Sequence, residues 1–279
     1  MPPTQREKAD AFKALHDAPG YFVIPNPWDG ASARILAALG YKALTTSSGA
    51  QAGTYGRRDG MVSRDEAMAH CRMIVEATDL PVAADMEKCY GDDSATCAET
   101  IASAAENGLV GGSIEDATGR ADQPLFEFED AVTRVSAAVE AARKLPFHFT
   151  LVARTEAFLR GGTPDVDFVI KRLKAFEAAG ADVLMAPGLP DLEAVRAVCQ
   201  SVSKPVNFMV GVPGRSFDVA SLAEAGVKRI SLATTLYKAA MTGLMAAAKE
   251  TLEQGTFSYV DTNVPTRDFA LMMQAPTAP

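Results

Sequence analysis

The chain has 279 residues, of which 48% are hydrophobic and 22% are charged, and this is the composition of an ordinary globular protein. A chain of this length can bury a large core without disulfides or a structural metal. Its net charge of −8 argues against nucleic acid or an anionic membrane surface as the main partner. An anionic substrate remains compatible with this charge, because cationic groups can gather locally at one site.

Signals for export and for disulfide bonding are weak. The N-terminus lacks the apolar stretch of a signal peptide, and no apolar run approaches the ~20 residues that span a bilayer. The four cysteines form no C-x-x-C pair and show no zinc-site spacing, which indicates reduced thiols. We therefore expect a cytoplasmic protein.

One unit recurs along the chain. An apolar run of strand length ends in small or polar residues, and an Ala- and Leu-rich stretch of helical length follows. The apolar runs are short and almost continuous, which is typical of parallel strands that are covered on both faces. The sequence predicts eight strands, at Tyr21–Ile24, Lys42–Thr46, Pro81–Asp85, Leu109–Ile114, Phe149–Arg154, Ala181–Ala186, Val206–Val210 and Lys228–Leu232.

The stretches between the strands carry helix signals at both ends. Ser63-Arg-Asp-Glu66 is a capping box, and it predicts a helix over Ser63–Thr78. Glycine closes several helices just before a strand, because it adopts the left-handed conformation that a helix end requires. These glycines are Gly40, Gly108, Gly180 and Gly226.

Eight strands that alternate with helices leave two folds, a closed (β/α)8 TIM barrel and a doubly wound open sheet. The barrel is favoured because the strands number eight and no G-x-G-x-x-G motif follows the first of them. We expect one α/β barrel domain over residues 1–279 with an extra C-terminal helix over Thr234–Gln254. Residues 255–279 are expected to form a C-terminal arm that packs on a neighbouring subunit or frays.

Acidic residues follow neighbouring strands at their carboxyl ends, where barrel enzymes carry their active sites. The third strand ends in Asp85-Met-Glu87, and strand alternation puts both carboxylates on one face. Glu115 ends the fourth strand. Carboxylates without a matching group of lysines suggest Mg²⁺, or Mn²⁺, held by these three acids and partly through water. Capping of helix N-termini is the alternative, and it is sufficient for Asp92, Asp93 and Asp116.

Arg154 ends the fifth predicted strand, in a position where an isolated cation is costly unless it meets anions. One interpretation is a guanidinium fork that binds a substrate carboxylate. The other is an internal salt bridge to Glu156 or Glu115.

The second strand runs into Ser47-Ser48-Gly49, where small residues allow backbone N–H groups to approach an anion. This signal is weak by itself, because Ser and Gly are common in loops. Asp59 follows in the same region. It either holds the waters of a metal ion or forms a turn with Gly60.

Seven short motifs occur in one order along the chain: Pro25-Asn-Pro-Trp-Asp29, Thr46-Ser-Ser-Gly49, Gly56-Arg-Arg-Asp59, Ala84-Asp-Met-Glu87, Tyr90-Gly-Asp92, Gly112-Ser-Ile-Glu-Asp116 and Ala153-Arg-Thr-Glu-Ala157. Because it carries these motifs in this order, the chain resembles the isocitrate lyase and phosphoenolpyruvate mutase superfamily along roughly its whole length. The resemblance implies a homo-oligomer, a dimer or a tetramer, whose C-terminal helix is swapped between subunits.

The resemblance also implies roles for single residues. The positions that it places around Mg²⁺ are Asp85, Glu87 and Glu115, with Asp59 near the metal waters. The positions that it places around the substrate carboxylate are Ser47, Ser48, Gly49 and Arg154. The second metal position is often Asp in the family, so Glu87 changes the reach toward the ion.

The chain departs from the family in two loops. The isocitrate-type lyases resemble one another in a Lys-Lys/Arg-Cys-Gly-His loop, but here the loop after Glu115 contains Arg120 and neither cysteine nor histidine. Pro187-Gly188 stands where those lyases carry Pro-Glu, and the mutase loop with its lysine and asparagine is also missing. Cleavage of isocitrate or methylisocitrate is therefore not expected.

The shared part of the site indicates a Mg²⁺-dependent lyase or decarboxylase. It would cleave a bond at C3 of a small 2-oxo or 2-hydroxy carboxylate such as oxaloacetate, through a metal-stabilised pyruvate enolate. The catalytic candidates are Arg154, Asp59 and Arg120, and residues 116–124 are expected to close as a lid. Arg120, Lys88 and Tyr90 are the candidate proton carriers.

Three alternatives remain open at this point. The first is C–P bond chemistry on phosphonopyruvate, as a hydrolase or a mutase. The second is a class II pyruvate aldolase that shares only the metal acids. The third is a catalytically silent barrel that binds a keto acid.

Overall fold

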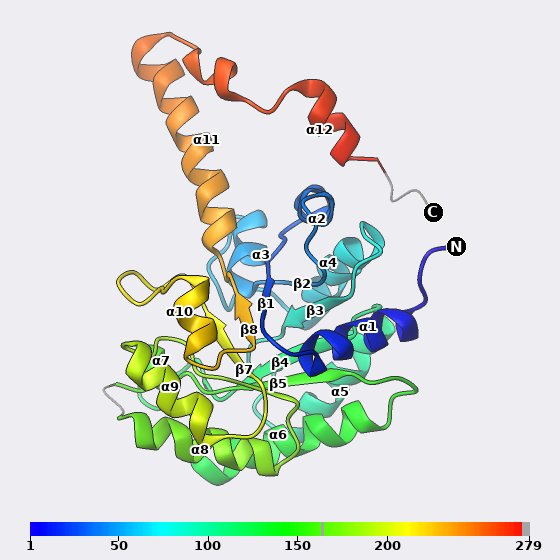
Figure 1. Cartoon of the computed structure of the whole chain (residues 1–279), viewed down its shortest axis with the longest axis vertical. Coiled ribbons are helices and arrows are strands. Elements are labelled where there is room, and N and C mark those ends of the chain that lie inside the picture. Colours follow the sequence, from blue (N-terminus) through cyan, green and yellow to red (C-terminus); the bar gives the residue numbers. More distant parts are fainter. Residues whose placement is uncertain (163–164, 275–279) are drawn as a thin grey trace.

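Eight parallel strands form a nearly closed barrel with helices around it (Figure 1). The structure is a computed structural model, and it describes residues 1–162 and 165–274. The hydrogen-bonded order is β1-β8-β7-β6-β5-β4-β3-β2. The strands are β1 (Phe22–Ile24), β2 (Leu44–Thr45), β3 (Val82–Asp85), β4 (Gly111–Glu115), β5 (Thr150–Arg154), β6 (Val183–Met185), β7 (Val206–Met209) and β8 (Arg229–Ser231). All eight predicted strands are confirmed.

The barrel closes between β1 and β2 through the residues that follow β1. The backbone N–H of Thr45 donates to the carbonyl oxygen of Pro25 at 3.1 Å. The side-chain amide of Asn26 donates to the carbonyl oxygen of Thr46 at 2.8 Å. These bonds join the two ends of the strand order, so the predicted (β/α)8 barrel is confirmed.

Helices follow the strands in the expected alternation. They are α1 (Gln5–Asp17), α2 (Gly30–Ala38), α3 (Ser48–Thr54), α4 (Arg64–Glu76), α5 (Ser94–Glu106), α6 (Phe128–Arg143), α7 (Ala157–Arg160), α8 (Val166–Ala178), α9 (Leu192–Ser201), α10 (Val219–Glu224), α11 (Thr235–Gln254), η1 (Ser258–Thr262) and α12 (Thr266–Met272). The capping box of α4 forms between Ser63 and Glu66, as predicted. The four helix-closing glycines have φ between 86° and 101°.

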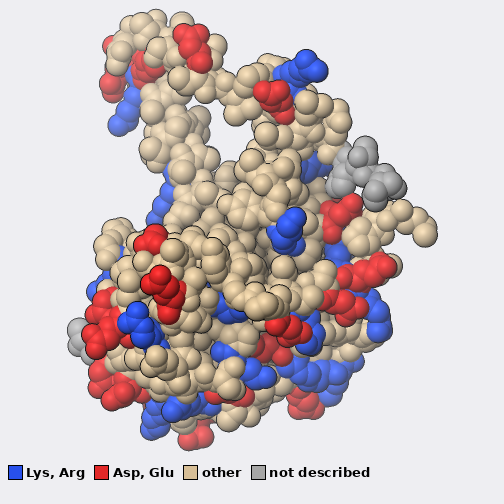
Figure 2. Space-filling model, viewed as in Figure 1, with Lys and Arg blue, Asp and Glu red and all other residues tan. Residues whose placement is uncertain are grey.

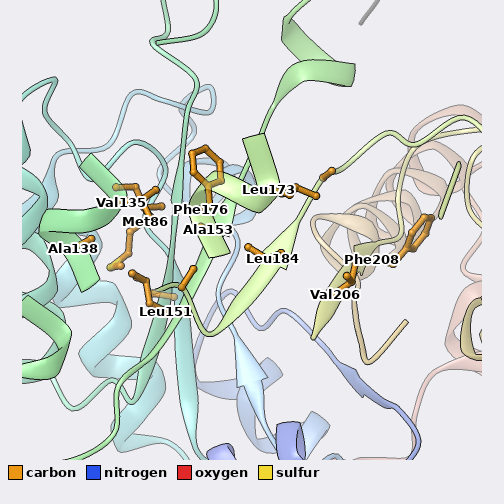
Figure 3. Packing of buried hydrophobic residues seen from close by; sticks show 14 of the residues in the cluster. Met86, Val135, Ala138, Leu151, Ala153, Leu173, Phe176, Leu184, Val206 and Phe208 are labelled. Atoms are coloured by element: carbon orange, nitrogen blue, oxygen red, sulfur yellow. The ribbon is translucent and has the colours of Figure 1, made fainter. Parts of the chain in front are cut away.

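The largest core cluster lies between the strands and the helices outside them (Figure 3). Leu151 and Ala153 of β5 pack in it together with Leu173 and Phe176 of α8. The three large side chains of this group are fully buried. Full burial of one such side chain stabilises the fold by roughly 1.5–3 kcal/mol, so this layer holds the strands in place.

Helix α1, which the sequence analysis did not predict, closes the N-terminal end of the barrel. Gln5 donates to the carbonyl oxygens of Ala105 and Leu109 at 2.8 and 2.9 Å. Phe12 is fully buried, and its ring lies where a side chain on Gly111 would otherwise point, 3.0 Å from an added Cβ. The aromatic ring therefore fills space that glycine leaves inside the barrel.

Helix α11 leaves the barrel and has no buried residue (Figure 1). It confirms the predicted C-terminal helix, with Thr234 at its N-cap. Gly255 ends it in the left-handed conformation, and the chain then returns until α12 lies beside α2. There the guanidinium of Arg34 donates to the carbonyl oxygen of Met273. The part of the arm at residues 275–279 lies outside the described residues. No helix among the described residues is long and apolar enough to cross a membrane.

Candidate active site

A cavity of about 310 Å³ lies inside the barrel and reaches the carboxyl ends of its strands. Its lining includes most of the residues predicted at the site. They are Ser47, Ser48, Gly49, Asp59, Asp85 and Arg154. A second cavity of about 650 Å³ adjoins it and takes in the other three, Glu87, Glu115 and Arg120. The two cavities share Ser48, Asp59, Arg154 and Arg160, so the predicted residues form one connected region.

Asp85 ends β3 and is held from two sides, by Ser48 at the start of α3 and by Ser113 of β4. One carboxylate oxygen accepts from the hydroxyl of Ser48 at 3.1 Å and from its backbone N–H at 3.4 Å. The other accepts from the hydroxyl of Ser113 at 3.4 Å. These bonds fix the carboxylate at the mouth of the barrel. They also engage the Ser48 amide, which was predicted to bind the substrate carboxylate.

Glu87 does not share a face with Asp85 by strand alternation, so that prediction was wrong. Strand β3 ends at Asp85, and Glu87 has a left-handed φ of 50°. Cys89 and Tyr90 follow with φ of 61° each, so this segment is a tight turn of strained residues. As a result Glu87 faces the second cavity. Burial raises the pKa of Glu87 to about 7, and the charges of Asp85 and Asp59 add to the effect.

Arg154 ends β5 among three acids. Its guanidinium contacts Glu156, lies 3.4 Å from Glu115 and lies 3.9 Å from Asp85. Burial opposes its charge, but the three carboxylates outweigh burial and hold the pKa of Arg154 above its ordinary value. The internal salt bridge that the sequence left open is therefore present. A substrate carboxylate would add to this network of charges.

Glu156 is itself buried, and two further groups hold it in place. Arg160 lies 3.4 Å from its second oxygen. The backbone N–H of Glu156 donates to the Asp116 carboxylate at 2.8 Å. Asp116 also accepts from Arg172 at 3.0 Å and from Thr155 at 2.7 Å. Asp116 is thus a buried ion-pair partner that positions Glu156, and helix capping does not describe it. Asp93 does cap α5, as predicted.

Gly49 packs too closely for a side chain. A Cβ at this position would lie 3.0 Å from the methyl group of Thr234 and 3.5 Å from the carboxylate of Asp59. Ser47 caps α3 by accepting from the backbone N–H of Ala50 at 3.4 Å. The segment therefore brings Asp59 next to the cavity that Asp85 lines.

Arg120 lies at the rim, on the loop after β4. Its guanidinium pairs with Asp92 at 2.6 Å, and Lys88 binds the same carboxylate at 2.5 Å. The loop is pinned at its base by an antiparallel bridge between Ala117 and Leu125. Its tip is exposed, and residues 117–120 line the second cavity.

The oxygen-rich mouth suits a hard cation. The two cavities are lined by six carboxylates (Asp59, Asp85, Glu87, Asp92, Glu115 and Glu156) together with four arginines (Arg120, Arg154, Arg160 and Arg229) and Lys88. Burial raises the pKa of Glu115 as well, against the opposing charge of Arg154. Within residues 1–162 and 165–274, no three His, Cys, Asp or Glu side chains converge closely enough to hold an ion alone. Mg²⁺ fits such a set, because it keeps several waters and needs only one or two direct carboxylates.

The sequence analysis missed the polar residues deeper in the first cavity. Asn207 lies in β7, and Arg229 and Ser231 lie in β8. Asn207 interrupts the apolar run Val206–Val210, whereas Arg229 and Ser231 lie in Lys228–Leu232, where three of five residues are polar. Polar residues inside these two predicted strands were the available signal. Asn26, which closes the barrel, also lines the cavity.

A parallel barrel with acids and an arginine at the carboxyl ends of its strands defines the class of this protein, a (β/α)8-barrel enzyme. The family model described as phosphoenolpyruvate phosphomutase matches residues 12–252. The chain belongs to the phosphoenolpyruvate mutase family, and the predicted family membership is confirmed.

Individual relatives indicate which reactions occur in proteins similar to this chain. The chain is 30% identical to an oxaloacetate decarboxylase of Paraburkholderia xenovorans over 87% of this chain and 81% of the relative. It is 30% identical to a 2-methylisocitrate lyase of Escherichia coli over 60% of this chain and 57% of the relative. A solved structure from Burkholderia cenocepacia, described as that of a lyase or mutase, has a TM-score of 0.95 and 47% identity over 98% of this chain and 97% of that chain. The predicted carbon–carbon lyase type of enzyme is confirmed.

Proposed function

We propose that the chain is a Mg²⁺-dependent lyase that breaks a bond at C3 of a small 2-oxo or 2-hydroxy carboxylate, with oxaloacetate as the first candidate. One observation carries the proposal: Arg154 and the acids Asp85 and Glu115 lie together at the mouth of a cavity of about 310 Å³. A cavity of this size suits a small molecule. The relatives named as oxaloacetate decarboxylases support the choice of substrate.

Asp85, Glu87 and Glu115 would hold the ion, partly through water. A divalent cation in this position supplies positive charge against the negative charge that develops on the substrate when the bond at C3 breaks. The hydrogen bonds from Ser48 and Ser113 keep Asp85 aimed at that position. No histidine or thiol takes part, because the donor set consists of oxygen atoms.

Arg154 would bind the substrate carboxylate and stay charged throughout the reaction. Its contacts with Glu156 and Glu115 orient the guanidinium before substrate arrives, so no reorganisation is needed during the bond-breaking step. In a decarboxylation, the electron pair of the C3–C4 bond moves onto the 2-oxo group as CO₂ leaves. A proton then adds to C3, and Arg120 on the loop after β4 is the candidate that delivers or relays it.

Chemistry at a C–P bond is the second candidate. The family model that matches the chain carries the name of a phosphomutase, and the same metal acids and arginine would serve phosphonopyruvate. The two candidates differ in the group that leaves C3. Substrate turnover therefore separates them directly.

The test is a Mg²⁺-dependent assay for pyruvate release from oxaloacetate, phosphonopyruvate, 2-methylisocitrate and alkylated malates. Phosphonopyruvate is also assayed for conversion to phosphoenolpyruvate, because a mutase releases no pyruvate. We expect turnover of oxaloacetate by the wild type and its loss in Asp85→Ala. Asp10→Ala, which removes an exposed carboxylate on α1, is the matched control and should retain activity. Turnover of phosphonopyruvate alone would establish the C–P candidate. Tight oxalate binding without turnover of any compound would identify a silent keto-acid-binding barrel.

We further propose that α11 and the arm at 255–279 bind a second copy of the chain in a cytoplasmic homo-oligomer. Apolar side chains along this segment are exposed, and they are Leu244, Met245, Leu252, Phe257, Val260, Val264, Phe269 and Leu271. Figure 2 shows that much of the surface of this projecting part is uncharged. Contiguous exposed apolar surface of this kind is typical of a subunit interface.

A further inference from the structure

The first cavity has a second charged end, which the proposed reaction does not use. Arg229 is the first residue of β8, and it pairs in register with Asn207 of β7 and Phe22 of β1. It lines the same cavity as Asp85 and Arg154. Those two residues are the last of their strands, so Arg229 lies deeper in the barrel, toward the end that α1 closes.

The Arg229 side chain is only 4% exposed. Its Nε and Nη1 atoms are buried and donate no hydrogen bond within the described part of the chain. No carboxylate of residues 1–162 or 165–274 lies within ion-pair distance of it, whereas Arg154 meets three. Burial alone lowers the pKa of Arg229 to about 10, which leaves the guanidinium charged at neutral pH.

The surroundings of Arg229 offer only a weak substitute for an anion. Its guanidinium lies 5.7 Å from the centre of the Phe12 ring, and a ring face attracts the charge but accepts none of the N–H bonds in the plane of the fork. The buried His16 on the same helix adds no negative charge. A buried cation without an anionic partner is strongly unfavourable, so its presence beside a cavity points to a ligand.

Two further polar groups line the cavity beside it. The side-chain amide of Asn207 donates to the hydroxyl of Ser231 at 3.0 Å, while the buried Oδ1 of Asn207 has no partner in the described chain. If the amide turns about its last bond, Oδ1 can accept from Ser231 and the NH₂ group can face the cavity instead. Arg229 and Asn207 would then offer donors to one anion from adjacent strands.

Part of the wall of the cavity is apolar, beside the polar residues Thr45, Thr46 and Ser113. Val152, Met185 and Met209 line the cavity between the acid-rich mouth and Arg229. Such walls suit the carbon chain of a substrate that carries a charged group at each end. A monocarboxylate would leave the deep arginine without its anion.

We propose that Arg229, together with Asn207 and Ser231, binds the distal carboxylate of the substrate and thereby selects dicarboxylic acids. This inference rests on the proposed function, because it places the reacting 2-oxo or 2-hydroxy carboxylate at the mouth. It assigns the substrate class as a 2-oxo or 2-hydroxy diacid whose second carboxylate points into the barrel.

The test compares unreactive ligands of equal carbon number by calorimetry. Malate is paired with 2-hydroxybutyrate, and 2-hydroxyglutarate with 2-hydroxyvalerate, so that each pair differs by one carboxylate in place of a methyl group. We expect the wild type to bind one diacid at least about tenfold more tightly than its partner, since a charge-assisted bond of this kind is worth that much. The preferred chain length then reports the span between the two ends of the cavity.

In Arg229→Met the ratio of diacid to monoacid affinity should fall to about one. The affinity for oxalate should stay unchanged, because oxalate is too short to reach the deep end of the cavity. Arg229→Lys keeps the charge without the fork and should retain part of the preference. Arg196→Met, an exposed arginine on α9, is the matched control and should behave as the wild type does. Thermal unfolding of ligand-free Arg229→Met should match or exceed that of the wild type, since the variant removes an unpaired buried charge.

Equal binding of diacid and monoacid by the wild type would overturn the inference and leave the deep end as a water-filled space. A large loss of thermal stability in Arg229→Met, with loss of oxalate binding, would show a structural role and overturn it as well. If Arg229→Met does not fold, the ratio of diacid to monoacid affinity in the wild type and in Arg229→Lys still tests the role of Arg229. Each ratio is measured with and without Mg²⁺. If the metal proposal holds, removal of Mg²⁺ lowers both affinities of a pair, and if it fails, neither affinity depends on Mg²⁺. The ratio within a pair reports on Arg229 in both cases, which separates the two failures.

Discussion

At the scale of the residue, the central group of the site is the guanidinium of Arg154, and several carboxylates compete for contacts with it. Three protein carboxylates surround it, and Glu156 is held in turn by Arg160 and by the backbone contact to Asp116. A guanidinium can serve several acids at once, because it presents five donors in a rigid plane. Lysine offers a single point charge, and it cannot reproduce this set of contacts.

The exchange Arg154→Lys should therefore lower kcat/KM for the substrate found in the turnover assay by about 100-fold or more, the usual cost of one lost donor at a developing charge. Steady-state kinetics on purified protein measures this change. Arg160→Lys is the matched control, because Arg160 is half exposed and contacts Glu156 from the other side. Equal losses in the two variants would contradict a special role for Arg154.

His16 gives the fold a pH dependence of calculable sign. Burial lowers its pKa from 6.5 to about 3, and the nearby charge of Arg229 adds to the shift. The unfolded chain therefore binds the proton first. As a result, the free energy of unfolding falls as the pH drops below about 6.5, and this loss continues until the pH nears 3.

Urea unfolding of the wild type and of His16→Gln at about pH 7.5 and about pH 5 measures this contribution. Between these values the wild type should lose about 2 kcal/mol more than the variant, as the linkage relation gives for one group with such a shift. The comparison with the variant removes the effect of the carboxylates, which titrate in both proteins. Parallel pH profiles would show that His16 can be protonated in the folded state.

At the scale of the element, the junctions between strands and helices decide which side chains reach the site. Strand β3 ends at Asp85, and the left-handed residues after it turn Glu87 toward the second cavity. At the junction of β2 and α3, Gly49 at the start of α3 lets the side chains of Asp59 and Thr234 approach the backbone. Both junctions depend on backbone geometry and close packing more than on charge.

The exchange Gly49→Ala tests the second junction. Its new methyl group would lie 3.0 Å from the Thr234 methyl group, which must shift, and at an ordinary contact distance of 3.5 Å from the Asp59 carboxylate. We expect kcat to fall by about tenfold or more, because small displacements of positioned groups are costly in catalysis. In Gly30→Ala the added Cβ has an ordinary contact of 3.5 Å with Ala77, and this control should keep its activity. Full activity of Gly49→Ala would show that the close packing of Gly49 against Thr234 does not position the site.

At the scale of the whole molecule, α11 carries the C-terminal segment away from the barrel (Figure 1). The apolar side chains of this segment have no cover within the described chain. A second copy of the same chain would bury them without requiring a different partner. The exposed apolar surface therefore supports the oligomer that the sequence predicted and that the fold alone does not test.

The exchange Leu244→Glu places a charge on this exposed face of α11. Light scattering after gel filtration should give a multiple of 29.5 kDa for the wild type and a smaller multiple for the variant. Met73→Glu replaces another exposed apolar residue, on α4, and should leave the mass unchanged. A wild-type mass equal to one chain would contradict the proposed interface.

The sequence by itself determined the eight strands, their alternation with helices and the family of the protein. It also placed Asp85, Glu115 and Arg154 at strand ends. These features follow from local patterns, since apolar runs, capping boxes and helix-closing glycines act within a few residues. Because parallel strands all present their carboxyl ends to one face, a terminal acid is at the site once the fold is known.

Only the tertiary structure decided the partners of Arg154, the orientation of Glu87 and the depth of Arg229. These depend on strand register and on backbone angles that no local pattern states. The closure of the barrel by Phe12 is of the same kind, since it requires a glycine about 100 positions away in the chain. Contacts across a barrel join residues distant in sequence, and their distances exist only after the sheet has closed.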